Sequence, residues 1–175
     1  MRWILLTTII FVSACSTTIK QYAQTTPTLK LDQFFNGKLT AYGIVQNRQG
    51  EVLRRFTVDM IGTWDGNRGV LDEQFYYSDG AREQRIWYLT KHSDGTYSGD
   101  ADDVVKPASG ESSGFALNWK YTLSIEVDGR NWDIDFNDWM YLIDEQRLVN
   151  RAEMTKWGFR VGEVTLFIEK EDPTT

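Results

Sequence analysis

Residues 121–136 read YTLSIEVDGRNWDIDF, and this stretch decides the fold. Apolar side chains alternate with polar ones on both sides of an Asp-Gly pair: Tyr121, Leu123, Ile125 and Val127 before it, and Trp132, Ile134 and Phe136 after it. Successive side chains of a strand point to opposite faces, and Asp-Gly between two alternating runs is a strong hairpin signal. The stretch therefore predicts two paired antiparallel strands, with Ile125 and Ile134 on the apolar face.

The same pattern continues outward along the chain. From Gly37 onward, turn residues recur about every ten residues between apolar runs, which is typical of an antiparallel meander. They lie at positions 47–50, 65–67, 78–80, 94–95 and 128–129, with a longer Gly- and Ser-rich loop expected at 107–114 and a bend at Gly158 and Gly162. We expect roughly 8–10 strands and no long helix.

So many antiparallel strands must cover their edges and bury one face. Closure into a barrel does both, so we predict an all-β fold, an antiparallel up-and-down meander that closes into a lipocalin-like barrel. A two-sheet β-sandwich is the alternative. Ahead of the meander, the spacing of Leu31, Phe34 and Phe35 fits a short helical turn or an entry strand that closes one end of the fold.

The N-terminus carries a short apolar run, residues 3–12, that ends in Val12-Ser13-Ala14-Cys15. A membrane-spanning helix needs about 20 apolar residues, so the run is typical of a removable export signal. Its end resembles a bacterial lipobox. The resemblance implies cleavage before Cys15 and lipid on that cysteine, and Ser16 in the next position matches the pattern sent to the periplasmic face of the outer membrane. The inner membrane, or an ordinary signal peptide with an incidental cysteine, are the alternatives.

Three regions follow from this pattern. Residues 1–14 are the predicted lipoprotein signal peptide, residues 15–29, rich in Thr, Ser and Gln, a flexible tether, and residues 30–172 a single β-barrel domain. The 161 residues left after cleavage (175 − 14) suit one domain with a core.

Charge and composition exclude several functions. Without the signal, 18 basic residues face 25 acidic ones (19 − 1 against 25), a balance of −7 that argues against nucleic acid. His92 is the only histidine and is expected in a solvated turn, so we predict no cofactor and no metal site. Asp100, Asp102 and Asp103 form an acidic group that matches no calcium-loop spacing. Chemistry by paired carboxylates stays open.

Aromatic residues are unusually frequent, with 7 Trp, 8 Tyr and 9 Phe. Tyr and Trp combine an apolar body with a polar tip, which suits a pocket for an amphipathic ligand, although core packing explains many of them equally well. The predicted ligand-binding residues are Trp64, Tyr77, Trp87, Tyr121, Ile125, Trp132, Ile134, Phe136, Arg82 and Arg151. Arg85 and Arg160 are further arginines that could pair with a ligand carboxylate or phosphate.

The chain also resembles a known family. The lipobox, the polar tether, the 31–37 entry, Gly62-Thr63-Trp64-Asp65, the 132–139 block and Trp157-Gly158-Phe159 are similar to proteobacterial lipoproteins of domain-of-unknown-function family 3833. The resemblance covers nearly all of residues 15–170 and implies no established activity. Its members are often encoded near cyclopropane-fatty-acid-synthase-like methyltransferases, which points toward membrane lipid.

The leading hypothesis is a non-enzymatic, membrane-anchored lipoprotein that faces the periplasm and binds an apolar or amphipathic ligand, such as a fatty acid or a modified lipid. The first alternative is a structural or assembly factor that binds an envelope protein through its outer surface. The third is a hydrolase that acts on lipid or glycan through paired carboxylates.

Replacement of Cys15 by Ser tests the anchor. We expect the Cys15→Ser chain to fold but to leave the membrane fraction, because stable anchoring needs the acyl chains. Detergent-phase partitioning measures the change. Partitioning that is the same with and without the substitution would contradict the lipobox assignment.

Overall fold

The computed structural model describes residues 17–127 and 129–171. Ten antiparallel strands make up most of this part of the chain, as the sequence predicts. They are β1 Gly37–Asn47, β2 Val52–Asp65, β3 Arg68–Tyr77, β4 Arg82–Lys91, β5 Tyr97–Asp100, β6 Val104–Ser113, β7 Ala116–Val127, β8 Arg130–Leu142, β9 Arg147–Lys156 and β10 Phe159–Lys170. A 3-10 turn, η1 Ile19–Tyr22, and one helical turn, α1 Leu31–Phe34, precede them.

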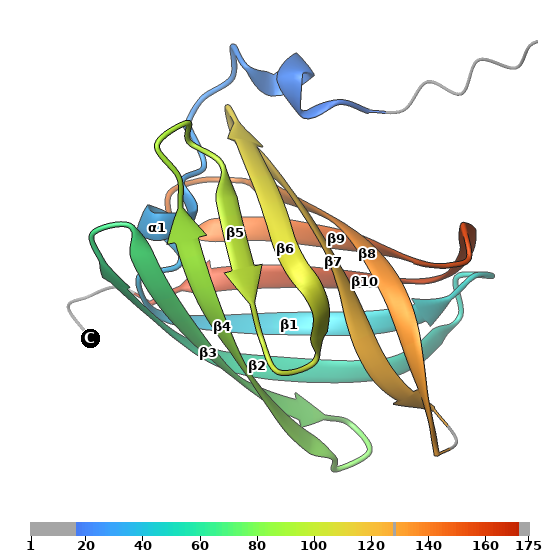
Figure 1. The fold of residues 1–175 in the computed structure, drawn as a ribbon. Coiled ribbons are helices and arrows are strands. Elements are labelled where there is room, and N and C mark those ends of the chain that lie inside the picture. The colour runs from blue at the N-terminus through green and yellow to red at the C-terminus, as the bar shows by residue number, and fades with distance from the viewer. Residues whose placement is uncertain (1–16, 128, 172–175) are drawn as a thin grey trace, which may run out of the picture.

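The strands form one closed barrel (Figure 1). Each strand pairs with its neighbours in sequence, and β1 closes the circle by pairing with β10, from Leu39 opposite Lys170 to Asn47 opposite Gly162. Every strand of the described residues therefore has a neighbour on both sides. In β4 only residues 88–91 pair with β5, so residues 82–87 of β4 have no ladder partner on that side. The predicted all-β fold, an up-and-down meander that closes into a barrel, is confirmed, and the sandwich alternative is wrong.

The hairpin of β7 and β8 has the register that alternation predicts. Leu123 lies opposite Ile134, and Ile125 lies opposite Trp132. Asp133 and Asp135 are exposed on the other face of β8. Asp128 of the predicted turn lies outside the described residues.

The predicted loop at 107–114 is wrong, because residues 104–113 form strand β6. Its small residues pack beneath Trp119 of β7: a Cβ on Gly110 would lie 2.3 Å from the Trp119 ring, and Ala108 is buried beside it. Glu111, Ser112 and Ser113 therefore lie in a strand, although residues of low strand propensity favour loops in isolation. Pro107 sits where the register of β6 shifts, a position that tolerates proline.

One end of the barrel is closed by α1, which confirms the predicted helical turn. Leu31, Phe34 and Phe35 are all buried there. Trp64 Nε1 donates a hydrogen bond to the Phe35 carbonyl oxygen over 3.0 Å. Gly62 allows this close approach, since a Cβ in its place would lie 2.0 Å from the same oxygen.

Residues 17–29, expected to be a tether without core contacts, lie against this closed end instead. Ile19 and Leu29 are buried. The Tyr22 ring packs 5.1 Å from the Phe115 ring, and Leu29 donates its backbone N–H to the Gly114 carbonyl oxygen. The apolar residues in this Thr-rich segment explain the contact. Residues 1–16, including Cys15 and the predicted signal peptide, lie outside the described residues.

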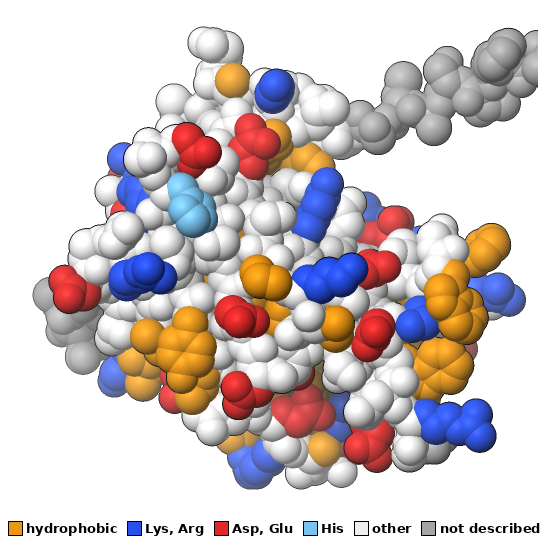
Figure 2. All heavy atoms as spheres, viewed as in Figure 1, with side chains coloured by type: hydrophobic (Ala, Val, Ile, Leu, Met, Phe, Trp, Pro, Cys, Tyr) orange, Lys and Arg blue, Asp and Glu red, His pale blue; other side chains and the backbone are white. Residues whose placement is uncertain are grey.

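The other end of the barrel is open and is bounded by the turns after β1, β3, β5, β7 and β9. Large hydrophobic side chains are exposed near these turns: Val52, Leu53, Val127, Trp157, Phe159 and Val161. Figure 2 shows hydrophobic side chains next to Lys and Arg side chains at the right-hand edge, over this end. The two helical elements of the described residues are each four residues long, too short to cross a membrane.

Candidate functional site

A cavity of about 540 Å³ lies inside the barrel. Leu31 and Phe35 close it at the α1 end, and Ile125 and Glu126 lie beside its mouth at the open end. Ligand pockets in proteins span about 300–1,000 Å³, so the barrel is hollow on the scale of a small ligand.

Most of the cavity wall is apolar, because inward positions of the strands alternate with outward ones. Nearest α1 the wall consists of Met60, Leu71, Leu89 and Trp119, and toward the mouth it consists of Phe56, Phe75, Val164 and Leu166. Trp87 packs edge-on to Tyr121 with ring centroids 5.4 Å apart. The aromatic residues of the interior thus frame the cavity and do not fill it.

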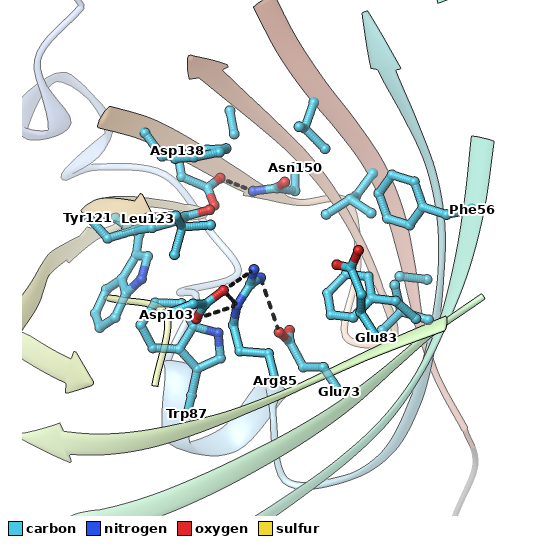
Figure 3. A pocket seen from close by; sticks show the side chains of 18 of the residues that line it. Phe56, Glu73, Glu83, Arg85, Trp87, Asp103, Tyr121, Leu123, Asp138 and Asn150 are labelled. Carbon is cyan, nitrogen blue, oxygen red and sulfur yellow. Dashed lines mark hydrogen bonds and ion pairs between the residues drawn. The ribbon is translucent and has the colours of Figure 1, made fainter. Parts of the chain in front are cut away.

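Charged residues interrupt this wall at Arg85 (Figure 3). Its guanidinium binds Asp103 bidentately, with Nη2 2.7 Å from Oδ2 and Nε 3.1 Å from Oδ1. Glu73, the cross-strand neighbour of Arg85, lies 3.9 Å away on the other side. One cation is therefore shared by two carboxylates.

Burial changes the protonation of this cluster. Loss of solvent raises the pKa of Glu73 to about 7, against the opposing charge of Arg85. The pKa of Arg85 is also raised: its hydrogen bonds to Asp103 and the charge of Glu73 outweigh the desolvation that acts in the other direction. Arg85 therefore stays charged, and Glu73 titrates near neutrality.

A second polar group lies across the cavity on β8 and β9. Asn150 donates Nδ2 to Asp138, and the Tyr121 hydroxyl also hydrogen-bonds this carboxylate. Burial raises the pKa of Asp138 to about 7, and the charge of Glu73 adds to the shift. Asn150 is 1% exposed, and within the described residues nothing donates to its Oδ1.

At the mouth, the guanidinium of Arg54 is paired with other side chains of the protein. Its guanidinium stacks 3.5 Å from the centre of the Tyr77 ring and binds Asp79 over 2.7 Å. Tyr77 in turn donates its hydroxyl to Glu83 over 2.9 Å. Among the described residues, the cavity wall carries five acids and two arginines: Glu73, Glu83, Asp103, Glu126 and Asp138, with Arg54 and Arg85. The interior is therefore rich in hydrogen-bond acceptors.

The family model described as a protein of unknown function, DUF3833, matches residues 9–170. The chain belongs to the DUF3833 family. This confirms the family that the sequence resembles. A direct search found no match among curated proteins.

Among solved structures, lobster apocrustacyanin A1 is similar to the DUF3833 chain, with 13% identity and a TM-score of 0.34. The match covers 78% of this chain and 61% of the lobster chain, so the chain spans about three fifths of that protein's length. At this identity and TM-score the likeness carries no information on function.

Five of the ten predicted ligand-binding residues of this DUF3833 chain line the cavity: Tyr77, Trp87, Tyr121, Ile125 and Phe136. The three other apolar residues predicted to bind the ligand do not line the cavity. Trp64 is held at the closed end by Phe35, and Trp132 packs 6.1 Å from Trp157 near the open end. Ile134 packs against a small cluster of Leu123, Phe136 and Ala152.

The two predicted arginines do not reach the cavity. Arg82 is exposed at the start of β4, 4.7 Å from the centre of the Tyr76 ring. Arg151 follows the inward Asn150 by one residue, so it points outward, where it binds Glu163 over 2.7 Å. Of the four arginines considered from the sequence, Arg85 lines the cavity, because it shares the face of Trp87 and Leu89 on β4.

The polar side chains of the site, Glu73, Asp103, Asp138 and Asn150, were not predicted as site residues. Strand alternation contains a signal for three of them. Glu73 continues the inward series Leu71, Phe75 and Tyr77, and Asp138 continues the series from Phe136. Asn150 lies between Leu148 and Ala152, both buried.

Asp103 alone of the predicted acidic group turns into the cavity, since Asp100 and Asp102 are exposed. No group of three potential ligand side chains in residues 17–127 and 129–171 is arranged to hold a metal ion. His92 is exposed in the turn after β4, as expected, and its Nε2 lies 2.9 Å from Ser98 Oγ.

The raised pKa values predict how stability depends on pH. Glu73 and Asp138 have pKa values of about 7 in the folded protein, above their ordinary values of 4.5 and 3.8. The folded state therefore binds more protons than the unfolded state between these values, so the free energy of unfolding falls as pH rises from about 4 to 7. The slope is up to about 1.4 kcal/mol per pH unit for each proton.

We expect Asp138→Asn to make this slope shallower by about one proton, measured by urea unfolding across the same pH range. Asp133→Asn, on the exposed face of the same strand, is the matched control and should keep the parent slope. An Asp138→Asn protein with the parent slope would show that Asp138 is ionised throughout.

Proposed function

We propose that this protein binds one amphipathic molecule with a long apolar chain, such as a membrane-derived lipid, inside its barrel. The observation that carries the proposal is the cavity of about 540 Å³, apolar along most of its length and polar at Arg85, Glu73 and Asp138. Each methylene group buried there contributes about 0.8 kcal/mol. Such a cavity favours a ligand with one apolar chain and one polar group.

The entrance supports the same function. The exposed hydrophobic residues near the open end surround the mouth, from Leu53 on β2 to Trp157 and Phe159 at the β9–β10 turn. Trp157 is 78% exposed and Lys156 lies over its ring. We assign these side chains to the entry of the ligand, and not to a separate docking surface for an envelope protein.

We further propose that lipid on Cys15 anchors the protein at the periplasmic face of the outer membrane. Cys15 precedes Thr17 by two residues, a reach of about 7 Å at most. Residues 19–29 lie against the closed end of the barrel. With this anchor, the mouth of the cavity would face away from the anchoring bilayer and toward the aqueous compartment.

A cavity-filling substitution tests ligand binding. Leu166 lines the cavity and is only half-buried, so its side chain borders free space. We expect Leu166→Trp to weaken binding of a fluorescent acyl probe at least about tenfold with a loss of stability below about 1.5 kcal/mol, since overpacking is costly only where no space exists. Fluorescence titration and urea unfolding measure the two effects.

Phe167→Trp is the matched control, because Phe167 is the next residue on β10 and points outward. It should bind the probe like the parent protein. If the parent takes up no acyl probe, or if both substitutions weaken binding equally, the proposed function is wrong.

A second candidate function, hydrolysis by paired carboxylates, has one observation in its favour. Glu73 and Asp138 line the same cavity, and both have pKa values of about 7, as general acids at neutral pH require. Such an enzyme would release p-nitrophenol from p-nitrophenyl laurate, and Glu73→Gln should slow this at least about a hundredfold. A parent protein no faster than Glu73→Gln would exclude the candidate for this ester.

A further inference from the structure

The cations of the cavity leave little room for an anionic ligand. Arg85 already binds Asp103 bidentately and has Glu73 at 3.9 Å. Arg54 binds Asp79 and stacks on Tyr77. A ligand carboxylate at Arg85 would have to displace Asp103, and separating a buried ion pair leaves an uncompensated charge. Both arginines are therefore neutralised by the protein itself.

The acceptors, in contrast, are in excess. Glu73 has a side chain 14% exposed, and Arg85, its one cationic partner among the described residues, also binds Asp103. Asp138 has no cationic partner among the described residues, and it receives hydrogen bonds from Asn150 and Tyr121. The inner wall therefore offers carboxylate oxygens to a ligand and few donors.

Asn150 adds an independent observation. Its Nδ2 is used by the Asp138 carboxylate, which directs its Oδ1 away from that bond. This Oδ1 is buried, belongs to a residue of the cavity wall, and receives no hydrogen bond within the described residues. Buried polar atoms are almost always paired, so a donor group bound beside Asn150 would satisfy an oxygen to which no described residue donates.

We propose that the polar group of the ligand is a hydrogen-bond donor, an amine or a hydroxyl, which binds the acceptors Glu73, Asp138 and Asn150. This inference rests on the proposed function and narrows its ligand class. Figure 3 shows Glu73 and the Asp138–Asn150 pair on opposite sides of the Arg85 guanidinium, and all of them line the same cavity. A donor group placed in this cavity reaches these acceptors, whereas the carboxylate of a free fatty acid meets like charge.

Three probes with the same twelve-carbon chain test the proposal: dodecylamine, dodecanol and laurate. Each competes with the uncharged dye Nile red for the purified full-length protein at pH 8, above the pKa values of Glu73 and Asp138. We expect dodecylamine and dodecanol to displace the dye at concentrations at least about tenfold lower than laurate, a difference of about 1.4 kcal/mol.

Two variants assign the preference to the acceptors. Glu73→Gln and Asp138→Asn each remove one negative charge at nearly constant shape, and each should reduce the ratio between laurate and dodecylamine at least about threefold. Asp133→Asn is the control on the outer face of β8 and should keep the parent ratio. If one cavity variant fails to fold, the other decides the result.

The outcomes separate the two proposals. Displacement of Nile red by none of the probes, or no binding of the dye, overturns the proposed function itself. Displacement by all three at equal concentrations, or best by laurate, overturns the donor inference and leaves ligand binding in place. A preference for the amine that both cavity variants retain also overturns it, because the preference then arises elsewhere.

Discussion

The pairing of β1 with β10 is the interaction on which the rest of the structure depends. Nine residue pairs join the first strand to the last strand, from Leu39 opposite Lys170 to Asn47 opposite Gly162. Without this pairing the meander would be an open sheet with two free edges and one apolar face in water. With it, the alternating side chains are divided into an interior and an exterior, and the interior becomes a place where solvent is scarce.

Closure alone does not make a cavity, because the interior of a small barrel is normally filled by side chains. Here Phe34, Phe35 and Trp119 are buried at the α1 end and close it, and the turns at the other end leave the barrel open. Small inward residues such as Ala41 and Ala152 keep the middle of the wall thin. The barrel is therefore closed at the α1 end and open at the other end, and Arg85, Glu73 and Asp138 lie between the two ends.

The fold was largely predictable because it depends on period two and on turn residues, both of which are local in the sequence. The hairpin at 121–136 shows this, since alternation and the Asp-Gly pair together predicted its two strands and their apolar face. The errors have a common cause in contacts between distant residues. Residues 107–114 were predicted as a loop, but Trp119 packs over Ala108 and Gly110 of strand β6. Residues 17–29 were predicted as a flexible tether, but the Tyr22 ring packs against the Phe115 ring.

The candidate site was harder to predict, for a physical reason. Sequence reasoning identified Trp87 and Tyr121 as inward aromatic residues, but it named Arg82, Arg85, Arg151 and Arg160 alike as candidate arginines and did not single out Arg85. Buried charges are costly to fold, and replacement of a buried ion pair by apolar side chains is often neutral or stabilising. Leucines at the positions of Arg85, Glu73 and Asp138 would therefore stabilise the fold about as well as these three residues do. Their presence on an otherwise apolar wall supports the proposed binding of a ligand, and in that proposal their excess of negative charge favours a polar group that donates hydrogen bonds.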